Sequence, residues 1–154
     1  MEKLTAFLEN FDPAALLPDL SNMMGTVDLL LRLAVLAGPI IVLILGLCYF
    51  LLPPKEANHS FGYRFFWGMN SMEAWRFMQK LAGIVWAALG LILTVAMFFI
   101  CSTFQSMETM DMVWRAVQCV LWELGLMIAS CLGIDITVVV LYDSKGNRRA
   151  KKEK

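Results

Sequence analysis

The sequence predicts an all-α membrane protein with three transmembrane helices and a short amphipathic helix at its N-terminus. Of its 154 residues, 59% are hydrophobic and only 17% are charged, whereas about a quarter of the residues of soluble domains carry a charge. The apolar residues gather in three long runs, and each run would span a hydrocarbon core of roughly 30 Å as a helix. We therefore expect one transmembrane domain over residues 29–142 and no soluble domain.

Residues 1–28 are predicted to form an acidic leader outside the membrane. Four apolar side chains recur at helical spacing near its start: Leu4, Phe7, Leu8 and Phe11. This pattern favours a short amphipathic helix that ends at Asp12-Pro13, because a proline disfavours helix in the residue before it. The polar side of that helix is acidic, whereas surface-seeking helices are usually rich in Lys and Arg. A helix on the outer face of the membrane and a loosely docked leader are both compatible with this pattern.

The first span is predicted at residues 29–52, where Arg32 is the only charge. It ends before Pro53-Pro54, because proline lacks the backbone N–H that a helix needs. Small residues recur at every fourth position in this span and in the two that follow, and such spacing lets helix backbones approach closely. These residues are Ala34 and Gly38, Gly83 and Ala87, and Gly125, Ala129 and Gly133. They predict a compact bundle, with a remaining stripe that could serve a homo-oligomer.

A polar and aromatic connector, residues 53–79, links the first two spans. Within it, Asn70 or Ser71 followed by Glu73 predicts an N-cap with an acidic residue in the first turn. The helix that begins there is expected to continue into the second span, residues 80–104. The tyrosine and tryptophans of the connector are typical of the aromatic belt at the level of the lipid headgroups.

The third span is predicted at residues 116–141 and contains Glu123, a lone carboxylate that suggests a function or a partner. We expect Glu123 to pair with Arg32, which lies on the same outer side of the membrane. Arg115 is the rival partner, because it lies about two turns earlier on a similar helix face. A structural ion pair that fixes helix register is the favoured interpretation. A proton or ion relay is the alternative, although a relay usually needs a chain of titratable groups.

A second acidic residue, Asp135, lies near the opposite end of the third span. Arg64 or Lys80 of the connector would reach it if the connector folds back beneath the bundle. A carboxylate that extends on its own toward the membrane interface is the competing interpretation.

Charge is distributed unevenly along the chain, although the net charge is zero. The leader contains one Lys against five acidic residues, whereas the connector and the tail at residues 143–154 are rich in Lys and Arg. Positively charged flanks of membrane spans tend to stay in the cytoplasm. We therefore expect the N-terminus outside, and the connector and the C-terminus in the cytoplasm. The tail has no apolar periodicity and is expected to be a disordered basic segment attracted to anionic lipid.

The sequence contains no pattern typical of an enzyme. Its four cysteines lie in or beside apolar runs without a C-x-x-C pair or a nearby histidine cluster, so they are interpreted as small apolar fillers. We find no nucleophile–base pair, phosphate loop or glycine-rich cofactor fingerprint, and the single histidine, His59, is interpreted as a loop residue. The sequence therefore predicts no enzymatic activity, no cofactor, no metal and no nucleic-acid partner.

The connector carries a recognisable pattern. In chain order it contains two prolines, an asparagine, a Gly-Tyr-Arg triplet, a serine, a tryptophan and a glycine: Pro53-Pro54, Asn58, Gly62-Tyr63-Arg64, Ser71, Trp75 and Gly83. This pattern resembles the SdpI family of bacterial membrane proteins over about residues 53–100. Phe65-Phe66 stand where that family usually has Thr-Pro, and Gln79 and Lys80 keep the amide and the cation of its Asn-Arg pair.

The resemblance implies a multi-pass protein of the bacterial inner membrane that binds a partner. The best-known member protects its cell from a secreted killing peptide and also holds a transcriptional repressor at the membrane. The implied partners are membrane lipid and a toxin peptide or cytoplasmic regulator. The connector residues expected to contact a partner or lipid are Asn58, Gly62, Tyr63, Arg64, Trp75, Gln79 and Lys80.

Two alternatives remain open at this level. In the first, Asn58, Arg64 and Gln79 staple the connector beneath the bundle and have an architectural role only. In the second, the connector is a recognition surface. The function has an alternative too, a structural or accessory subunit of a larger membrane complex or transporter.

Overall fold

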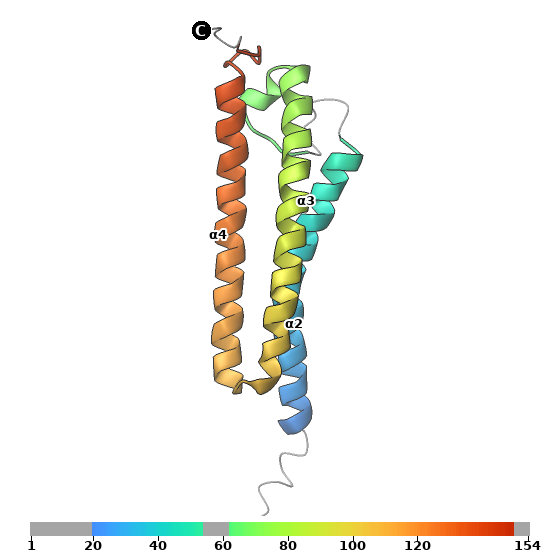
Figure 1. The fold of residues 1–154 in the computed structure, drawn as a ribbon, viewed down its shortest axis with the longest axis vertical. Helices are drawn as coiled ribbons and strands as arrows, with labels where there is room; N and C mark the ends of the chain where they lie inside the picture. Colours follow the sequence, from blue (N-terminus) through green and yellow to red (C-terminus); the bar gives the residue numbers. More distant parts are fainter. Residues whose placement is uncertain (1–19, 54–61, 150–154) are drawn as a thin grey trace, which may run out of the picture.

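The computed structural model describes residues 20–53 and 62–149, and within these ranges the chain forms three long helices (Figure 1). They are α2 (Leu20–Leu51), α3 (Met72–Ser102) and α4 (Thr109–Leu141). Two short 3-10 helices, η1 (Trp67–Met69) and η2 (Thr103–Ser106), lie between them along the chain. The all-helical prediction is confirmed for the described residues. The amphipathic helix predicted near the N-terminus lies outside them.

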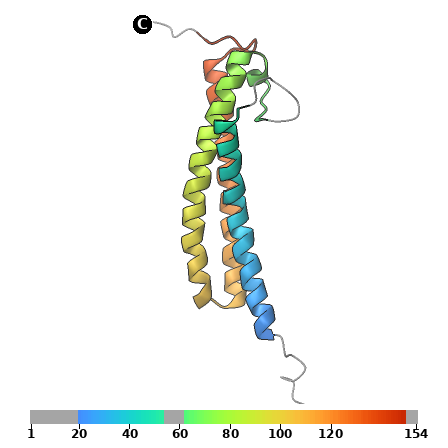
Figure 2. The same cartoon turned by 90° about the vertical axis from the view of Figure 1, so that its right-hand side faces the viewer.

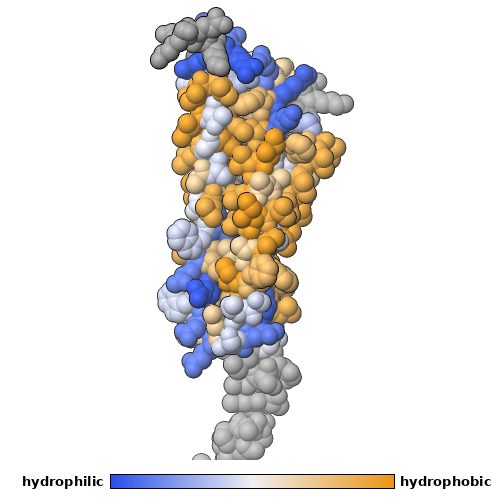
Figure 3. Space-filling model, viewed as in Figure 1, coloured by the Kyte–Doolittle hydropathy of each residue, from blue (hydrophilic) through white to orange (hydrophobic). Residues whose placement is uncertain are grey.

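All three long helices are apolar and long enough to cross a membrane. The candidate spans are Gly25–Leu51, Met72–Ser106 and Thr109–Leu141. Figure 3 shows apolar side chains over the middle of the visible face of the bundle and hydrophilic ones gathered toward its two ends. This distribution is expected when the middle of a protein faces lipid and its ends face water. For the described residues, the prediction of three helices that are long and apolar enough to span a membrane is therefore confirmed.

The helix ends beside the connector follow the predicted local signals. α2 ends at Leu51, shortly before the paired prolines. α3 begins at Met72, and the Ser71 hydroxyl accepts a hydrogen bond of 3.1 Å from the Ala74 N–H, as expected of an N-cap. α4 begins at Thr109, earlier than the predicted residue 116, because the helix continues through the polar residues that precede the apolar run.

Helices α2 and α3 pack backbone against backbone at glycines. A Cβ atom added at Gly83 would lie 2.6 Å from the backbone nitrogen of Phe50 in α2, and one at Gly46 would overlap the backbone of α3. The absence of a side chain permits this approach in lipid, where no hydrophobic effect drives helices together. By contrast, a Cβ atom added at Gly125 or Gly133 of α4 would meet no atom of the described residues within 4 Å, so these two glycines do not pack against α2 or α3.

The buried side chains form two clusters, one toward each end of the bundle. The connector-end core consists of Tyr49, Ala74, Trp75, Met78, Ala82, Trp86, Ile134, Val138 and Tyr142. The far-end core consists of Val35, Leu93, Met97, Cys101, Phe104, Met112, Ala116 and Cys119. Figure 2 shows that the start of α3 and the end of α4 lie at the same end of the bundle, which is why residues distant in sequence share the first cluster.

One connector residue occupies a different place from the predicted one. Trp75 is completely buried in the connector-end core, with 0% of its surface exposed. Its side chain therefore lies inside the bundle and not on an exposed surface, which corrects its placement among the surface residues of the connector. Trp75 lies in the first turn of α3, and the rotation of that helix directs its side chain into the bundle.

Candidate functional site

The Gly-Tyr-Arg triplet is fastened to α3 by a buried glutamine. The Tyr63 N–H donates to Gln79 Oε1 at 2.9 Å, and Gln79 Nε2 donates to the Tyr63 carbonyl oxygen at 2.6 Å. Gln79 is completely buried. These two bonds pair both backbone polar groups of Tyr63 with the side-chain amide, so neither partner is left unsatisfied. Gly62, with a φ of 117°, allows the turn that leads into this arrangement. We call it the connector clamp.

The side chain of Tyr63 extends the clamp to α4. Its hydroxyl donates to Asp135 Oδ1 at 2.7 Å and lies 3.2 Å from the carbonyl oxygen of Cys131. Its ring meets Trp86 edge to face at 5.4 Å between centroids. Burial, and then the hydrogen bond to Asp135, raise the pKa of Tyr63 far above its ordinary value, so the hydroxyl keeps the proton that it donates. Asp135 therefore pairs with this tyrosine and not with Arg64 or Lys80, its predicted partners.

The residues that flank the clamp face outward. Arg64 follows Tyr63, Lys80 follows Gln79, and both cations are exposed. Neither forms an ion pair with another residue of the described ranges. Phe66 is 69% exposed, a high value for so large an apolar side chain. The clamp thus separates the predicted site residues into a buried architectural group and an exposed group, and Asn58 lies outside the described residues.

The start of the C-terminal tail folds over the connector end, which the sequence reasoning missed. Besides capping α3, the Ser71 hydroxyl donates to the Gly146 carbonyl oxygen at 2.6 Å. Asn70 Nδ2 donates to the carbonyl oxygen of Ser144 at 2.9 Å. Gly146 has a φ of 77° and lies so close to Ser71 that a Cβ atom would lie 2.7 Å from the serine Cβ. Residues 143–149 are therefore ordered, in contrast to the disordered tail that was expected.

An aspartate organises this turn from within. The Asp143 carboxylate accepts hydrogen bonds from the backbone N–H groups of Lys145 and Asn147, at 2.9 and 2.8 Å. The bond from Asn147 is the main reason why the pKa of Asp143 is lowered below its usual value. In a sequence, an aspartate followed within a few residues by a glycine indicates a turn, because the aspartate side chain can accept hydrogen bonds from the backbone of the residues that follow it. The tail contains this pattern at Asp143 and Gly146, although its basic composition favours a disordered segment.

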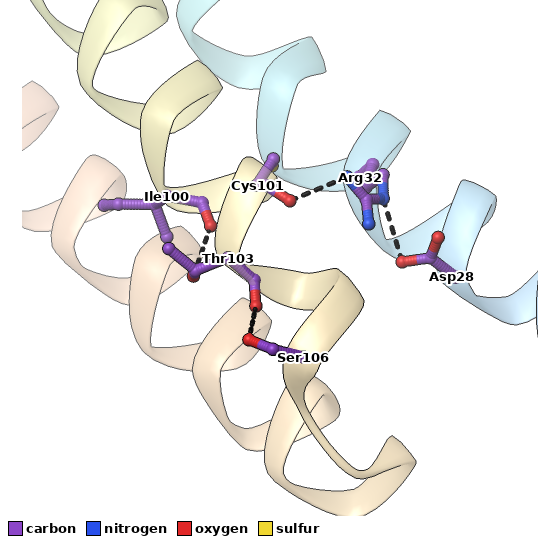
Figure 4. Close-up of polar contacts among 6 residues, drawn as sticks. All are labelled: Asp28, Arg32, Ile100, Cys101, Thr103 and Ser106. Atoms are coloured by element: carbon purple, nitrogen blue, oxygen red, sulfur yellow. Dashed lines mark hydrogen bonds and ion pairs between the residues drawn. The ribbon is translucent and has the colours of Figure 1, made fainter.

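At the far end of the bundle, Arg32 has partners other than the predicted one (Figure 4). Its Nε donates to Asp28 Oδ1 at 2.8 Å, and its Nη1 donates to the carbonyl oxygen of Cys101 at 2.7 Å. Asp28 lies one turn earlier on the same helix. Cys101 lies in the last turn of α3, where carbonyl groups have spare capacity to accept hydrogen bonds. The predicted pair of Arg32 with Glu123 is therefore absent: Asp28 and the Cys101 carbonyl group bind two of the guanidinium nitrogens, and the third, Nη2, is buried without a hydrogen-bond partner among the described residues.

Glu123 lies instead in a groove between the three helices. It is 9% exposed, and its Oε1 is buried without a hydrogen-bond partner among the described residues. The groove has a volume of about 230 Å³, and α2, α3 and α4 all contribute apolar side chains to its wall. The rival partner, Arg115, is exposed and lines a separate hollow near the start of α4 together with Asp111 and Gln118. We call this feature the Glu123 groove.

Comparison with known proteins identifies the family of the chain. The model of the SdpI/YfhL protein family matches residues 55–142, more than half of the chain. The matched range contains the connector clamp, with Tyr63, Gln79 and Asp135, and also Glu123. No curated protein and no solved structure matches the chain. Because the matched range includes the Gly-Tyr-Arg element that carries the sequence resemblance, the chain belongs to the SdpI/YfhL protein family.

Proposed function

We propose that this family member is a non-enzymatic binding protein of the bacterial inner membrane. It recognises a toxin peptide or a cytoplasmic regulator through the exposed residues beside the connector clamp. The observation that carries the proposal is the placement of Arg64, an exposed cation directly joined to a tyrosine whose backbone and side chain are both fastened. A fixed backbone lowers the entropy lost when a partner binds.

The exposed group has the chemistry of a recognition surface. A guanidinium group binds carboxylates, phosphates or backbone carbonyl groups in a fixed geometry. Arg64 presents this group, Lys80 adds a second cation, and Phe66 adds a large apolar surface two residues after Arg64. Arginine and aromatic residues are enriched among the residues that dominate binding energies. The partner that fits best carries an acidic group next to an apolar one.

We propose an orientation in the membrane from the charges at the connector end. Exposed cations gather at the connector end, namely Arg64, Arg76, Lys80, Lys145, Arg148 and Arg149. By the tendency of basic flanks to stay inside, we place the connector and the C-terminus in the cytoplasm and the N-terminus outside. In this orientation a cytoplasmic regulator meets the exposed group directly, whereas a toxin peptide meets it after entering the membrane. Anionic lipid headgroups would be attracted to the same cations.

The test compares the partners captured by matched arginine variants. Wild type, Arg64→Ala and Arg76→Ala are crosslinked in native membranes and then purified by affinity. Both variants remove an exposed arginine from the connector end, but only Arg64 adjoins the clamp. We expect a peptide or soluble regulator to be captured by wild type and by Arg76→Ala, and to fall about tenfold in Arg64→Ala. Equal capture by all three proteins would contradict recognition through Arg64.

A second candidate, an accessory subunit of a larger membrane complex, is favoured by one observation. A Cβ atom added at Gly125 or Gly133 of the small-residue stripe of α4 would meet no other described residue within 4 Å, and such stripes pack against other transmembrane helices. This candidate predicts copurification with a larger membrane protein, equally in the wild type and in Arg64→Ala. The first candidate predicts instead that expression preserves the membrane potential under toxin challenge or retains a regulator at the membrane.

A further inference from the structure

The Glu123 groove contains a buried acidic group without a partner, and the connector clamp does not explain it. Buried carboxyl groups are normally paired, because an unpaired buried charge or acceptor costs free energy. Arg32 is engaged by Asp28 and by the Cys101 carbonyl group, and Arg115 lines a different hollow. Among the described residues, no cation forms an ion pair with Glu123. The group that would pair with it is therefore not supplied by this part of the chain.

The shape and lining of the groove define what could supply that group. Gly38, Pro39 and Val42 of α2 face Leu93 of α3 across the groove, and Glu123 is the only ionisable residue in its wall. Gly38 leaves the carboxylate its space, because a Cβ atom at this position would lie 2.7 Å from Glu123 Oε2. A ligand of this groove must therefore be apolar over most of its surface and carry one positively charged donor. The groove, with a volume of about 230 Å³, suits a compact apolar body.

We propose that the Glu123 groove binds a small amphiphilic ammonium compound, with its apolar body among the three helices and its protonated nitrogen on the carboxylate of Glu123. Charge complementarity favours a cation over a neutral ligand, because a charge-assisted hydrogen bond to a buried carboxylate is stronger than a neutral one. This site is separate from the exposed residues beside the clamp and does not depend on the function proposed for them.

The experiment uses adamantylamine, a compact apolar cage with a single ammonium group. Radiolabelled adamantylamine is equilibrated with the full chain in lipid nanodiscs and with empty nanodiscs, so that partition into lipid is subtracted. We expect one saturable site per chain. Methyladamantane, which has nearly the same shape without the charge, is expected to compete at least about tenfold less well. Equal competition by the two compounds would overturn the role of the charge.

Two variants test the assignment to Glu123. Glu123→Gln keeps the size of the side chain and should weaken adamantylamine binding about tenfold or more. Asp111→Asn removes a carboxylate from outside the groove and should leave binding unchanged. Unaltered affinity in Glu123→Gln, or the absence of saturable binding in the wild type, would overturn the proposal.

A third variant keeps the proposal testable if Glu123→Gln inserts poorly. Gly38→Ala retains the carboxylate but displaces it into the groove, because the new methyl group meets only that side chain. We expect adamantylamine binding to fall several-fold while the protein keeps its helicity and its elution volume. Full binding by a correctly folded Gly38→Ala protein would show that the ligand does not occupy the groove.

Discussion

Two buried polar side chains, Gln79 and Glu123, have opposite environments in the same bundle. Both ends of the Gln79 amide are bonded to the backbone of Tyr63. Glu123 is nearly as deeply buried, yet its Oε1 has no hydrogen-bond partner in the described part of the chain. Gln79 therefore satisfies its own polar groups and those of Tyr63, whereas Glu123 keeps one carboxylate oxygen without a hydrogen bond. The difference separates a buried amide that holds the connector in place from a buried carboxyl group that is free to take the ligand proposed for the groove.

The glycines beside these two residues show the same contrast. Gly83, one turn after Gln79, lies against the backbone of Phe50, which cannot move without displacing a helix. Gly38 lies against the carboxylate of Glu123, which is the mobile end of a side chain. One region is therefore closely packed and resists change, and the other contains space and a group that can move.

The largest expected effect comes from replacing each buried polar residue by leucine. Gln79→Leu leaves the N–H and the carbonyl group of Tyr63 buried without their partner, and should lower the free energy of unfolding by about 2–4 kcal/mol. Glu123→Leu removes an unsatisfied carboxyl group and should be neutral or stabilising, by about 0–2 kcal/mol. Reversible unfolding in mixed detergent micelles, followed by circular dichroism, measures both values. Equal losses in the two variants would break the comparison, because Glu123 would then have a partner that stabilises the fold.

The next effect comes from the same substitution at two glycines. Gly83→Ala should lower the free energy of unfolding by about 1–3 kcal/mol, because its methyl group overlaps the backbone of the neighbouring helix. Gly38→Ala should cost less than about 1 kcal/mol, because only a side chain must move and alanine favours the helix. Gly125→Ala, at a glycine with no neighbour within 4 Å, is the matched control and should not destabilise the protein. A Gly38→Ala protein as unstable as Gly83→Ala would show that the groove is as closely packed as the helix crossing.

Much of the architecture could be predicted from local sequence. The apolar runs predict the three helices, the paired prolines predict the end of α2, and Ser71 with Glu73 predicts the start of α3. Each of these features depends on residues that are close together in the chain. The Gly-Tyr-Arg element also marks the connector clamp. The pattern could not show, however, that Tyr63 forms hydrogen bonds with both Gln79 and Asp135.

The features that escaped prediction depend on how the helices are rotated and on competition between partners. Depth in the membrane suggested that Arg32 and Glu123 pair, because both lie toward the same side. Depth does not specify direction, however, and Asp28 and the Cys101 carbonyl group are nearer acceptors for the arginine. The same limit applies to Trp75. Its position near the membrane boundary predicts a side chain at the lipid headgroups, but an aromatic residue at that depth can also point into the core, as Trp75 does.

The smallest expected effect sharpens the comparison at the surface of the connector end. Asp143 has a lowered pKa in the folded turn, so its hydrogen bonds stabilise the turn at pH values above the ordinary aspartate pKa of about 4. This contribution should be lost as the pH falls through the lower, folded-state pKa. The protection factor of the Asn147 amide, which is its exchange rate relative to the intrinsic rate at the same pH, should fall on acidification. In Asp143→Asn this amide should show weak protection at every pH.

The position of this turn makes the result informative for the whole connector end. Residues 143–149 contact Asn70 and Ser71, but the bonds of Gln79 to Tyr63 do not involve the turn. Exchange at the Tyr63 N–H should therefore stay slow when the turn opens, because its protection comes from a fully buried amide. Simultaneous loss of protection at Tyr63 and Asn147 would mean that the clamp depends on the tail. In that case the closed architecture of the connector end would be conditional, and its contrast with the Glu123 groove would diminish at low pH.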